Sequence, residues 1–408
     1  MKKKNIVICC TLNTKGNEAY YLKEAIESLG NTTTMIDVSL RGSSSFHPDI
    51  TKEHVAEAAG VAFAEVAAIQ SRNEASKIMV EGLTRIVKEL LATDQLQGII
   101  SLGGSGGTTI STGAMQQLPL GVPKVVVGTM ACGNTVPYIM GQDILLINSV
   151  VDMQSLNFLS KHILDEAARI VCSLANMPKL TRQKKKAIGI TCFGVTTPCV
   201  DRCTELLEKE GYEILIFHAR GVSGGKIMEK MISEGFFTAV LDITTTELID
   251  EIAGGGYAIG NERLRAAVKK NIPYIVCPGA ADMINIGPKE NLKPEQADHV
   301  QYFHNSSLLK LRANKDEMIR LADLFVDRLK DSDGKTHLVI PTNGFDEIDK
   351  EGNVFFDPEA DAAFARRVKE TMPDNVPVIC RDNHINDKEF ADFLVKDLLG
   401  LIEGTGKQ

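Results

Sequence analysis

The sequence predicts an α/β protein made of two Rossmann-like domains, each with a parallel sheet flanked by helices. Short runs rich in Val and Ile alternate with helical stretches along almost the whole chain, as in parallel sheets. The length of 408 residues suits two domains, and 44% hydrophobic residues can fill two aliphatic cores in the absence of Trp. A charged segment divides the chain, and the strand–loop–helix order then starts again.

The first domain, residues 1–178, contains five expected strands. Asp152–Asn176 predicts a helix, and Thr51–Ala92 predicts two helices that break near Gln70–Asn73, because apolar residues recur there every three or four positions. The expected strands are Asn5–Leu12, Thr33–Val38, Gly98–Leu102, Lys124–Gly128 and Ile144–Asn148.

The second domain, residues 187–408, follows Pro178 and the charged linker Arg182–Lys186. Its opening, Ala187–Cys192, repeats the apolar pattern of Ile6–Thr11, which indicates a weak internal duplication. Thr197–Glu210 predicts its first helix. The expected strands are Ala187–Cys192, Glu213–His218, Phe237–Asp242, Tyr274–Cys277, His337–Ile340 and Val376–Arg381.

Composition argues against several classes of protein. A net charge of −8 without a basic patch is unlike a nucleic-acid-binding protein, and no apolar run is long enough to cross a membrane. The apolar stretch after Met1–Lys4 lacks a cleavage site and is interpreted as a strand rather than a signal peptide. Nine cysteines without metal-ligand spacing indicate a cytoplasmic protein with no structural metal. We expect a homo-oligomer.

A glycine-rich loop directly after Gly98–Leu102 carries the strongest local signal. Glycines let backbone N–H groups approach a phosphate at the start of the next helix. The loop fits neither the P-loop nor the GxGxxG pattern, and a tight strand-to-helix turn is the alternative. The predicted anion-binding residues are Gly103, Gly104, Ser105, Gly106, Gly107 and Thr108.

Other loops of the first domain follow strands and would share the same edge of the sheet. Asp37 ends the second strand, where dinucleotide-binding folds place the carboxylate that binds the ribose. The further candidate residues for cofactor binding are Thr11, Asn13, Gly128, Thr129 and Met130.

The second domain has its own candidate site. His218 ends a strand, and Asp282 and Asn285 follow the strand Tyr274–Cys277, so all three belong at the carboxyl edge of the sheet. With Arg312 they predict a pocket in which His218 is the base or acid, Asp282 orients it and Arg312 holds an anion. The alternative is that each side chain satisfies local backbone.

Six ordered motifs resemble an uncharacterised bacterial and plant family that includes the ATP-binding N-terminal domain of the tomato mosaic virus resistance protein. The motifs span Gly103–Thr108, Gly128–Ile144, Phe217–Ile232, Leu241–Leu248, Pro278–Pro288 and Phe356–Asp361.

The resemblance covers essentially the whole chain and implies two Rossmann-like domains and, for at least one member, ATP binding. It also brings His304 into the second site, although this chain has HNSSL there where the family has HNPNV. We therefore expect a protein that binds ATP, with or without Mg²⁺, and has a second site for a small anion. The alternatives are a hydrolase or carbon–carbon lyase acting on an anionic small molecule, and a ligand sensor without turnover.

Overall fold

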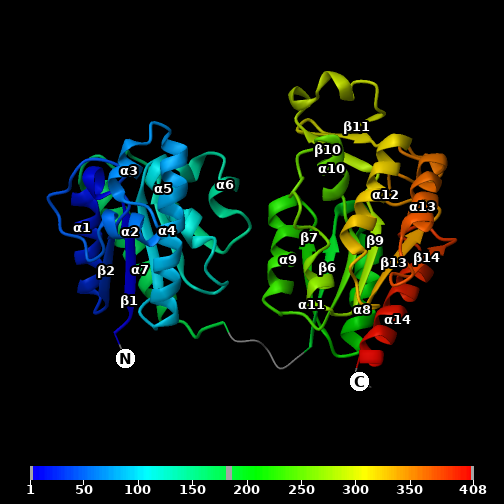
Figure 1. Cartoon of the computed structure of the whole chain (residues 1–408), viewed down its shortest axis with the longest axis horizontal. Coiled ribbons are helices and arrows are strands. Elements are labelled where there is room, and N and C mark those ends of the chain that lie inside the picture. The colour runs from blue at the N-terminus through cyan, green and yellow to red at the C-terminus, as the bar shows by residue number, and fades with distance from the viewer. Residues whose placement is uncertain (1–2, 181–185, 406–408) are drawn as a thin grey trace. The chain divides into compact units, whose positions relative to one another are not determined.

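The computed structural model of the chain describes residues 3–180 and 186–405. The chain divides into two compact units, Met1–Thr181 and Arg182–Gln408. Each unit has a parallel sheet with helices on both faces (Figure 1), which confirms the predicted fold class. Of the predicted linker Arg182–Lys186, only Lys186 lies within the described residues.

The N-terminal unit contains five strands in the order β2-β1-β3-β4-β5, all parallel. The elements are β1 (Asn5–Cys10), α1 (Leu12–Ser28), β2 (Thr32–Asp37), α2 (Lys52–Ala58), α3 (Phe63–Ala68), α4 (Arg72–Ala92), β3 (Gly98–Gly103), α5 (Ser105–Met115), β4 (Lys124–Gly128), α6 (Val136–Ile139), β5 (Ile144–Asn148) and α7 (Phe158–Ala175).

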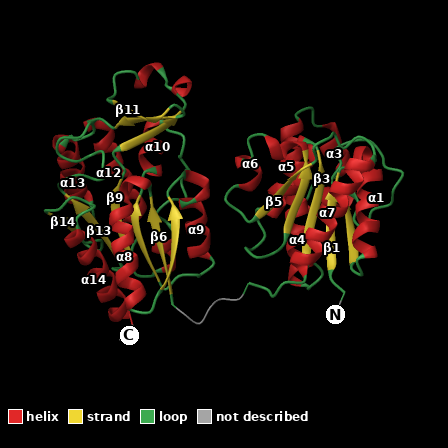
Figure 2. Cartoon of the chain, turned by 180° about the vertical axis from the view of Figure 1, so that it is seen from behind, coloured by secondary structure: helices red, strands yellow, loops and turns green. Residues whose placement is uncertain are grey.

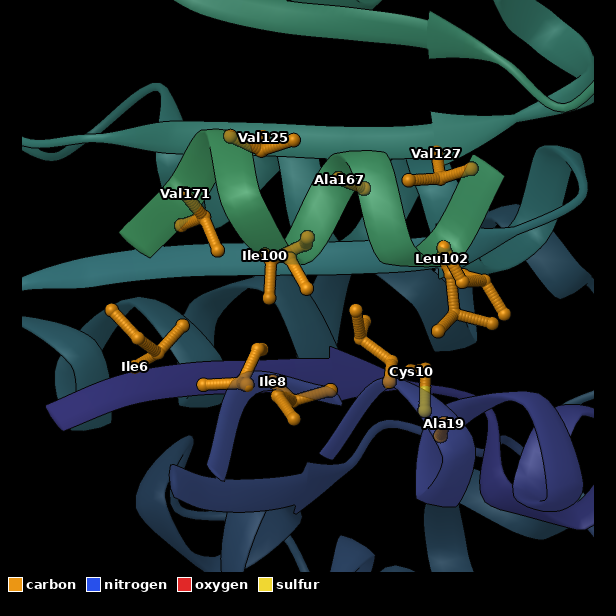
Figure 3. Close-up of a cluster of buried hydrophobic side chains, with 14 of the residues drawn as sticks. Ile6, Ile8, Cys10, Ala19, Ile100, Leu102, Val125, Val127, Ala167 and Val171 are labelled. Atoms are coloured by element: carbon orange, nitrogen blue, oxygen red, sulfur yellow. The ribbon is translucent and has the colours of Figure 1, made fainter. Parts of the chain in front are cut away.

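Both faces of this sheet are buried, because successive side chains of a strand point to opposite faces and here both sets are apolar. Ile8 packs on the α1 and α7 side, where Figure 3 shows it next to Ile100 of β3. Val7 and Cys9 pack on the other side, under α4 and α5. The near-continuous apolar strands of the sequence are therefore explained.

Helix boundaries differ from the expected ones in two places. The stretch Thr51–Ala92 forms three helices instead of two, because Gly60 adopts φ 85° and ends α2 before α3 begins. The break expected near Gln70–Asn73 is present, with Ser71 capping α4. The helix expected from Asp152 begins at Phe158, where Asn157 provides a capping box.

The C-terminal unit contains six parallel strands in the order β14-β13-β9-β8-β6-β7 and a separate antiparallel sheet, β10-β12-β11. The elements are β6 (Ala187–Cys192), α8 (Thr197–Lys209), β7 (Glu213–His218), α9 (Gly225–Ser233), β8 (Ala239–Thr244), α10 (Glu247–Ala253), α11 (Ala266–Lys270), β9 (Tyr274–Gly279), β10 (Met283–Gly287), β11 (Gln301–Asn305), β12 (Leu308–Arg312), α12 (Lys315–Leu329), β13 (Thr336–Pro341), α13 (Pro358–Thr371), β14 (Val378–Arg381) and α14 (Lys388–Thr405).

The two parallel sheets share one strand order. Counted within each parallel sheet, the second strand lies outside the first, and the third, fourth and fifth strands follow on the other side; the C-terminal sheet continues with a sixth strand, β14. The common order agrees with the duplication suggested by the two opening strands. The small antiparallel sheet was not predicted, and Figure 2 shows it at the end of the C-terminal unit toward which the parallel strands point.

Candidate functional sites

The strand order of the N-terminal unit creates a crevice between β1 and β3. The chain leaves β1 into α1 on one face of the sheet and leaves β3 into α5 on the other. The two loops therefore diverge at the carboxyl ends of these strands, which is where open α/β sheets bind their ligands.

A cavity of about 650 Å³ occupies this crevice. The predicted residues Thr11 and Asn13 line it from the loop after β1, and the glycine-rich loop lines it from the start of α5. The Asn13 side-chain nitrogen donates to the carbonyl oxygen of Arg41 at 2.8 Å and so ties the loop after β2 to the cavity. The lining residues are Thr11, Asn13, Thr14, Lys15, Leu40, Arg41, Ile69, Arg72, Ala75, Ser76, Gly104, Ser105, Gly106, Gly107, Ile110 and Gln154.

The glycines of this loop leave room for a ligand. Gly103 adopts φ 148°, which favours glycine on conformational grounds. A Cβ on Gly104 or Gly106 would meet no atom within 4 Å, so nothing in the protein itself requires glycine at these two positions. The first N–H groups of α5 begin at Ser105, and Gly104 caps the helix without a side chain. An anion could therefore reach the positive end of this 11-residue helix directly.

The charges around the cavity also favour an anion. Lys15, Arg41 and Arg72 line it, and no carboxylate is among the lining residues. The Lys15 ammonium donates to the carbonyl oxygen of Met153, and the Arg41 guanidinium donates to that of Ile69 at 2.8 Å. Arg72, at the first turn of α4, forms no hydrogen bond or ion pair with another described residue. Three cations in a chain of net charge −8 thus converge on one cavity.

Six of the predicted cofactor-binding residues do not line this cavity: Gly103 and Thr108 of the glycine-rich loop, and four from other parts of the unit. Asp37 is buried, and its Oδ1 accepts hydrogen bonds from the Leu12 and Ser39 N–H groups and from the Ser39 hydroxyl, so this oxygen stabilises local structure. Gly128 lies against β3, where a Cβ would come within 2.5 Å of the Gly103 carbonyl oxygen. The other two, Thr129 and Met130, form the short 3₁₀ helix after β4.

Thr108 lies in α5 behind the glycines and does not line the cavity either. Its hydroxyl is buried and has no partner among the described residues. Sequence reasoning did not select Arg41 or Arg72, which come from a loop and a helix start that carry no motif.

The corresponding crevice of the C-terminal unit is filled by threonines. Thr196 follows β6 and Thr244 ends β8, and their hydroxyls share a hydrogen bond of 2.8 Å. Both side chains are completely buried. Thr191 on β6 closes the same region by accepting from the Thr244 N–H at 2.9 Å. The two units therefore share a strand order but differ at this point, and the open crevice belongs to the N-terminal unit.

Arg312 stabilises the fold of the C-terminal unit instead of facing an open site. Its guanidinium donates to the Phe355 carbonyl oxygen at 2.7 Å and to Asp361 Oδ1 at 2.6 Å, and only 4% of the residue is exposed. The expected anion clamp is thus engaged within the protein. Burial lowers the pKa of Arg312, but the neighbouring Asp282 and Asp361 carboxylates outweigh it, so the net shift is upward and the group stays charged.

The structure places His218 and Asp282 around Lys310, a residue of β12 that sequence reasoning did not select. The rings of His218 and Phe193 lie 5.2 Å apart, and the Lys310 ammonium lies 4.4 Å from the Phe193 ring centre. Burial lowers the pKa of His218, and the charges of Arg220 and Lys310 add to this effect. His304 is exposed at the end of β11, where its ring lies 6.4 Å from that of Tyr302.

A second cavity, of about 540 Å³, lies beside the small sheet. Asn285, one of the predicted site residues, lines it, and Arg220 and Tyr257 line it from two loops of the C-terminal unit. The Arg220 guanidinium lies 5.5 Å from the Tyr257 ring centre and forms no ion pair with another described residue. Within the described residues no helix is long and apolar enough to span a membrane, and no cluster of His, Cys, Asp and Glu is arranged to hold a metal.

These features define a doubly wound α/β protein. Its first sheet has a basic cavity at the switch point, the place between β1 and β3 where the strand order reverses. The profiles of the uncharacterised protein family UPF0261 match residues 4–180 (N-terminal domain) and 185–402 (C-terminal domain), so the chain belongs to this family. The resemblance inferred from the ordered motifs is confirmed at the level of the family.

The relatives are bacterial and plant proteins. A UPF0261 protein of Clostridium tetani is 41% identical over 98% of this chain and 99% of its own length. The ToMV resistance protein Tm-1(GCR237) of Solanum lycopersicum is 35% identical over 95% of this chain, which corresponds to 54% of the tomato protein. The UDP-N-acetylglucosamine 2-epimerase structure from Rickettsia bellii aligns over 98% of this chain and 96% of that one, but 11% identity and a TM-score of 0.24 support no comparison of function.

Proposed function

We propose that the N-terminal unit binds a nucleotide, with ATP as the first candidate, and that the phosphates lie on the N-terminus of α5. The observation that carries this proposal is the cavity at the β1/β3 switch point, where an uncapped, glycine-lined helix start meets three cations and no carboxylate. The helix dipole, the free N–H groups and the side-chain charges all favour an anionic ligand there.

The rest of the cavity suits the less polar part of a nucleotide. Leu40, Ile69, Ala75 and Ile110 contribute an apolar wall, and about 650 Å³ lies within the usual range for a small-molecule site. Mg²⁺ prefers carboxylate and phosphate oxygens. Since the lining residues offer hydroxyls but no carboxylate, a Mg²⁺ ion here would be held mainly by the phosphates of the nucleotide.

Calorimetric titration of the full chain with ATP, ADP, AMP and adenosine tests this proposal. Affinity should fall with each phosphate removed and should fall as salt rises, because the contacts are largely electrostatic. Arg72→Met should weaken ATP binding about tenfold, the effect of losing one hydrogen bond to a charged group.

Arg85→Met is the matched control, because Arg85 is an exposed arginine of the same helix that pairs with Glu81 and does not line the cavity. Equal affinities for adenosine and ATP, or no binding of ATP at millimolar concentration, would rule out the phosphate site.

We also propose that the C-terminal unit binds a small anion in the cavity lined by Arg220 and Asn285. The supporting observations are the Arg220 guanidinium without a carboxylate partner and the buried Asn285 Oδ1 without a donor. The test is whether small carboxylates such as pyruvate raise the melting temperature of the wild type but not of Arg220→Met.

A further inference from the structure

Lys310 is a buried lysine without a salt bridge. Only 5% of the residue is exposed, and its Nζ donates to Met283 Sδ at 3.0 Å while facing the ring of Phe193. No carboxylate of the described residues lies within 4.0 Å of this nitrogen. A thioether and a ring face are weak partners for a charge, whereas buried ammonium groups in proteins are normally paired with carboxylates.

Acidic groups lie near Lys310 but do not reach it. Asp282 is completely buried, and both of its carboxyl oxygens lack a hydrogen-bond donor, as does Asp346 Oδ2. The amine and these oxygens are close enough to affect one another electrostatically, yet they form no direct hydrogen bond. The Arg312 guanidinium lies 3.8 Å from Asp282 Oδ2 without donating a hydrogen bond to it. A polar group of a bound molecule would therefore supply hydrogen bonds that the protein leaves unmade.

The protonation states in this cluster suit a nucleophilic amine. Burial lowers the pKa of the Lys310 ammonium, and the carboxyl groups of Asp346, Asp282 and Asp250 oppose this effect without cancelling it. Burial and the neighbouring Asp346 carboxylate raise the pKa of Asp282, and the nearby Arg312 guanidinium opposes them. His218 is a further titratable neighbour, and burial lowers its pKa as well. Both pKa shifts, of Lys310 and of Asp282, favour the uncharged forms of the amine and the carboxyl, and these are the forms that attack on a carbonyl needs.

We propose that Lys310 forms an imine with a small substrate that carries both a carbonyl and a carboxylate group. Lys310 does not itself line the cavity of Arg220, but it lies opposite Asn285 in the β10–β12 pair, and Asn285 does line it. The substrate would therefore reach the amine past Asn285. The substrate carboxylate binds Arg220, a part of the proposal that rests on the anion site proposed above, and the carbonyl reaches the amine.

The step balances without any other reactant. Nζ attacks the carbonyl carbon and forms a C–N bond, and the carbonyl oxygen takes a proton from Asp282. The C–O bond then breaks, and the oxygen leaves as water with one proton from Nζ and one from the carboxyl. The product is a protonated imine, which withdraws electrons from the neighbouring bonds of the substrate and is typical of carbon–carbon lyases. Asp282 regains its proton from solvent.

Reductive trapping on the full wild-type chain tests the proposal. The protein is incubated with pyruvate or acetaldehyde and sodium cyanoborohydride, which delivers hydride to the imine carbon and leaves a stable secondary amine. Peptide mass spectrometry then measures the labelled fraction of each lysine. We expect Lys310 to be labelled at least tenfold faster than Lys289, an exposed lysine that also lies near an aromatic ring, that of Phe303 at 5.8 Å.

Variants separate the proposed imine at Lys310 from the proposed anion site at Arg220. Lys310→Met should abolish the fast adduct with an unchanged circular dichroism spectrum, and Asp282→Asn should slow labelling at neutral pH. Arg220→Met should remove only the preference for pyruvate over acetaldehyde. If both probes label Lys310 equally, the lysine is reactive but the anion site fails. If neither probe labels Lys310 faster than Lys289 in the wild type, the inference is wrong.

Discussion

Gly106→Ala should make the protein more stable and its nucleotide binding weaker. Gly106 lies in the first turn of α5, and its Cβ would meet no atom within 4 Å, so the fold can accept a methyl group there. Alanine in a helix is more stable than glycine by about 0.5–1 kcal/mol. Since a domain of this size shifts its melting temperature by about 2–4 °C per kcal/mol, the N-terminal transition should rise by about 1–4 °C.

The same methyl group should obstruct the ligand. In a helix the Cα–Cβ bond tilts toward the N-terminus, which here is the wall of the cavity. A phosphate pushed away from the first turn loses at least one hydrogen bond between a charged group and an N–H, worth about 1.5–3 kcal/mol. The dissociation constant for ATP should therefore rise about 10- to 150-fold.

Scanning and titration calorimetry on the same preparations measure both effects. Gly194→Ala is the control, because a Cβ on this glycine of the C-terminal unit also meets nothing within 4 Å and does not approach the cavity. An unchanged ATP affinity in a stable Gly106→Ala protein would show that the loop is only a turn.

Three further predictions concern stability. Gly128→Ala should destabilise the N-terminal unit by about 1–3 kcal/mol, because the new Cβ would lie 2.5 Å from the Gly103 carbonyl oxygen; hydrogen exchange in denaturant can measure this, and an unchanged stability would contradict the close contact. Arg263→Met should cost the C-terminal unit about 3–5 kcal/mol, since it leaves the buried Asp242 carboxylate without its ion pair; the double variant with Asp242→Asn should recover part of the loss in the same assay. Burial raises the pKa of Asp250 from 3.8 to about 8, so this carboxyl should lower the free energy of unfolding as pH rises through that interval. Urea titrations at several pH values should show that the free energy of unfolding falls less steeply with pH in Asp250→Asn than in the wild type. Equal slopes against pH would refute the raised pKa.

Much of the fold could be predicted from the sequence. Runs of Val and Ile mark buried parallel strands whatever their neighbours, and the expected strands Gly98–Leu102 and Ala187–Cys192 lie within one residue of the observed ones. The small sheet β10–β12 was missed because its strands interleave apolar residues with polar ones such as Asn285, His304 and Lys310, and lack the runs of Val and Ile that identified the others.

The candidate sites were predicted only in part. The position of the glycine-rich loop after a strand placed it at the correct edge of the sheet, because that follows from local order alone. Asp37 has the sequence position of a ribose ligand, but the first turn of α1 and Ser39 occupy its Oδ1. Arg312 was predicted to hold an anion, but it ends the unpredicted strand β12, and Asp361 and the Phe355 carbonyl oxygen engage its guanidinium.

The sequence by itself determined which segments are buried and which loops follow strands, because apolar periodicity and glycine content are local properties of the chain. Only the tertiary structure decided which side chains meet. Arg72 lines the same cavity as the glycine-rich loop because α4 starts at the crevice, and Lys310 lies among acidic groups because the small sheet folds over the strand ends. The interaction energies of these charges depend on burial and on distances across the fold, and the order of the residues along the chain determines neither directly.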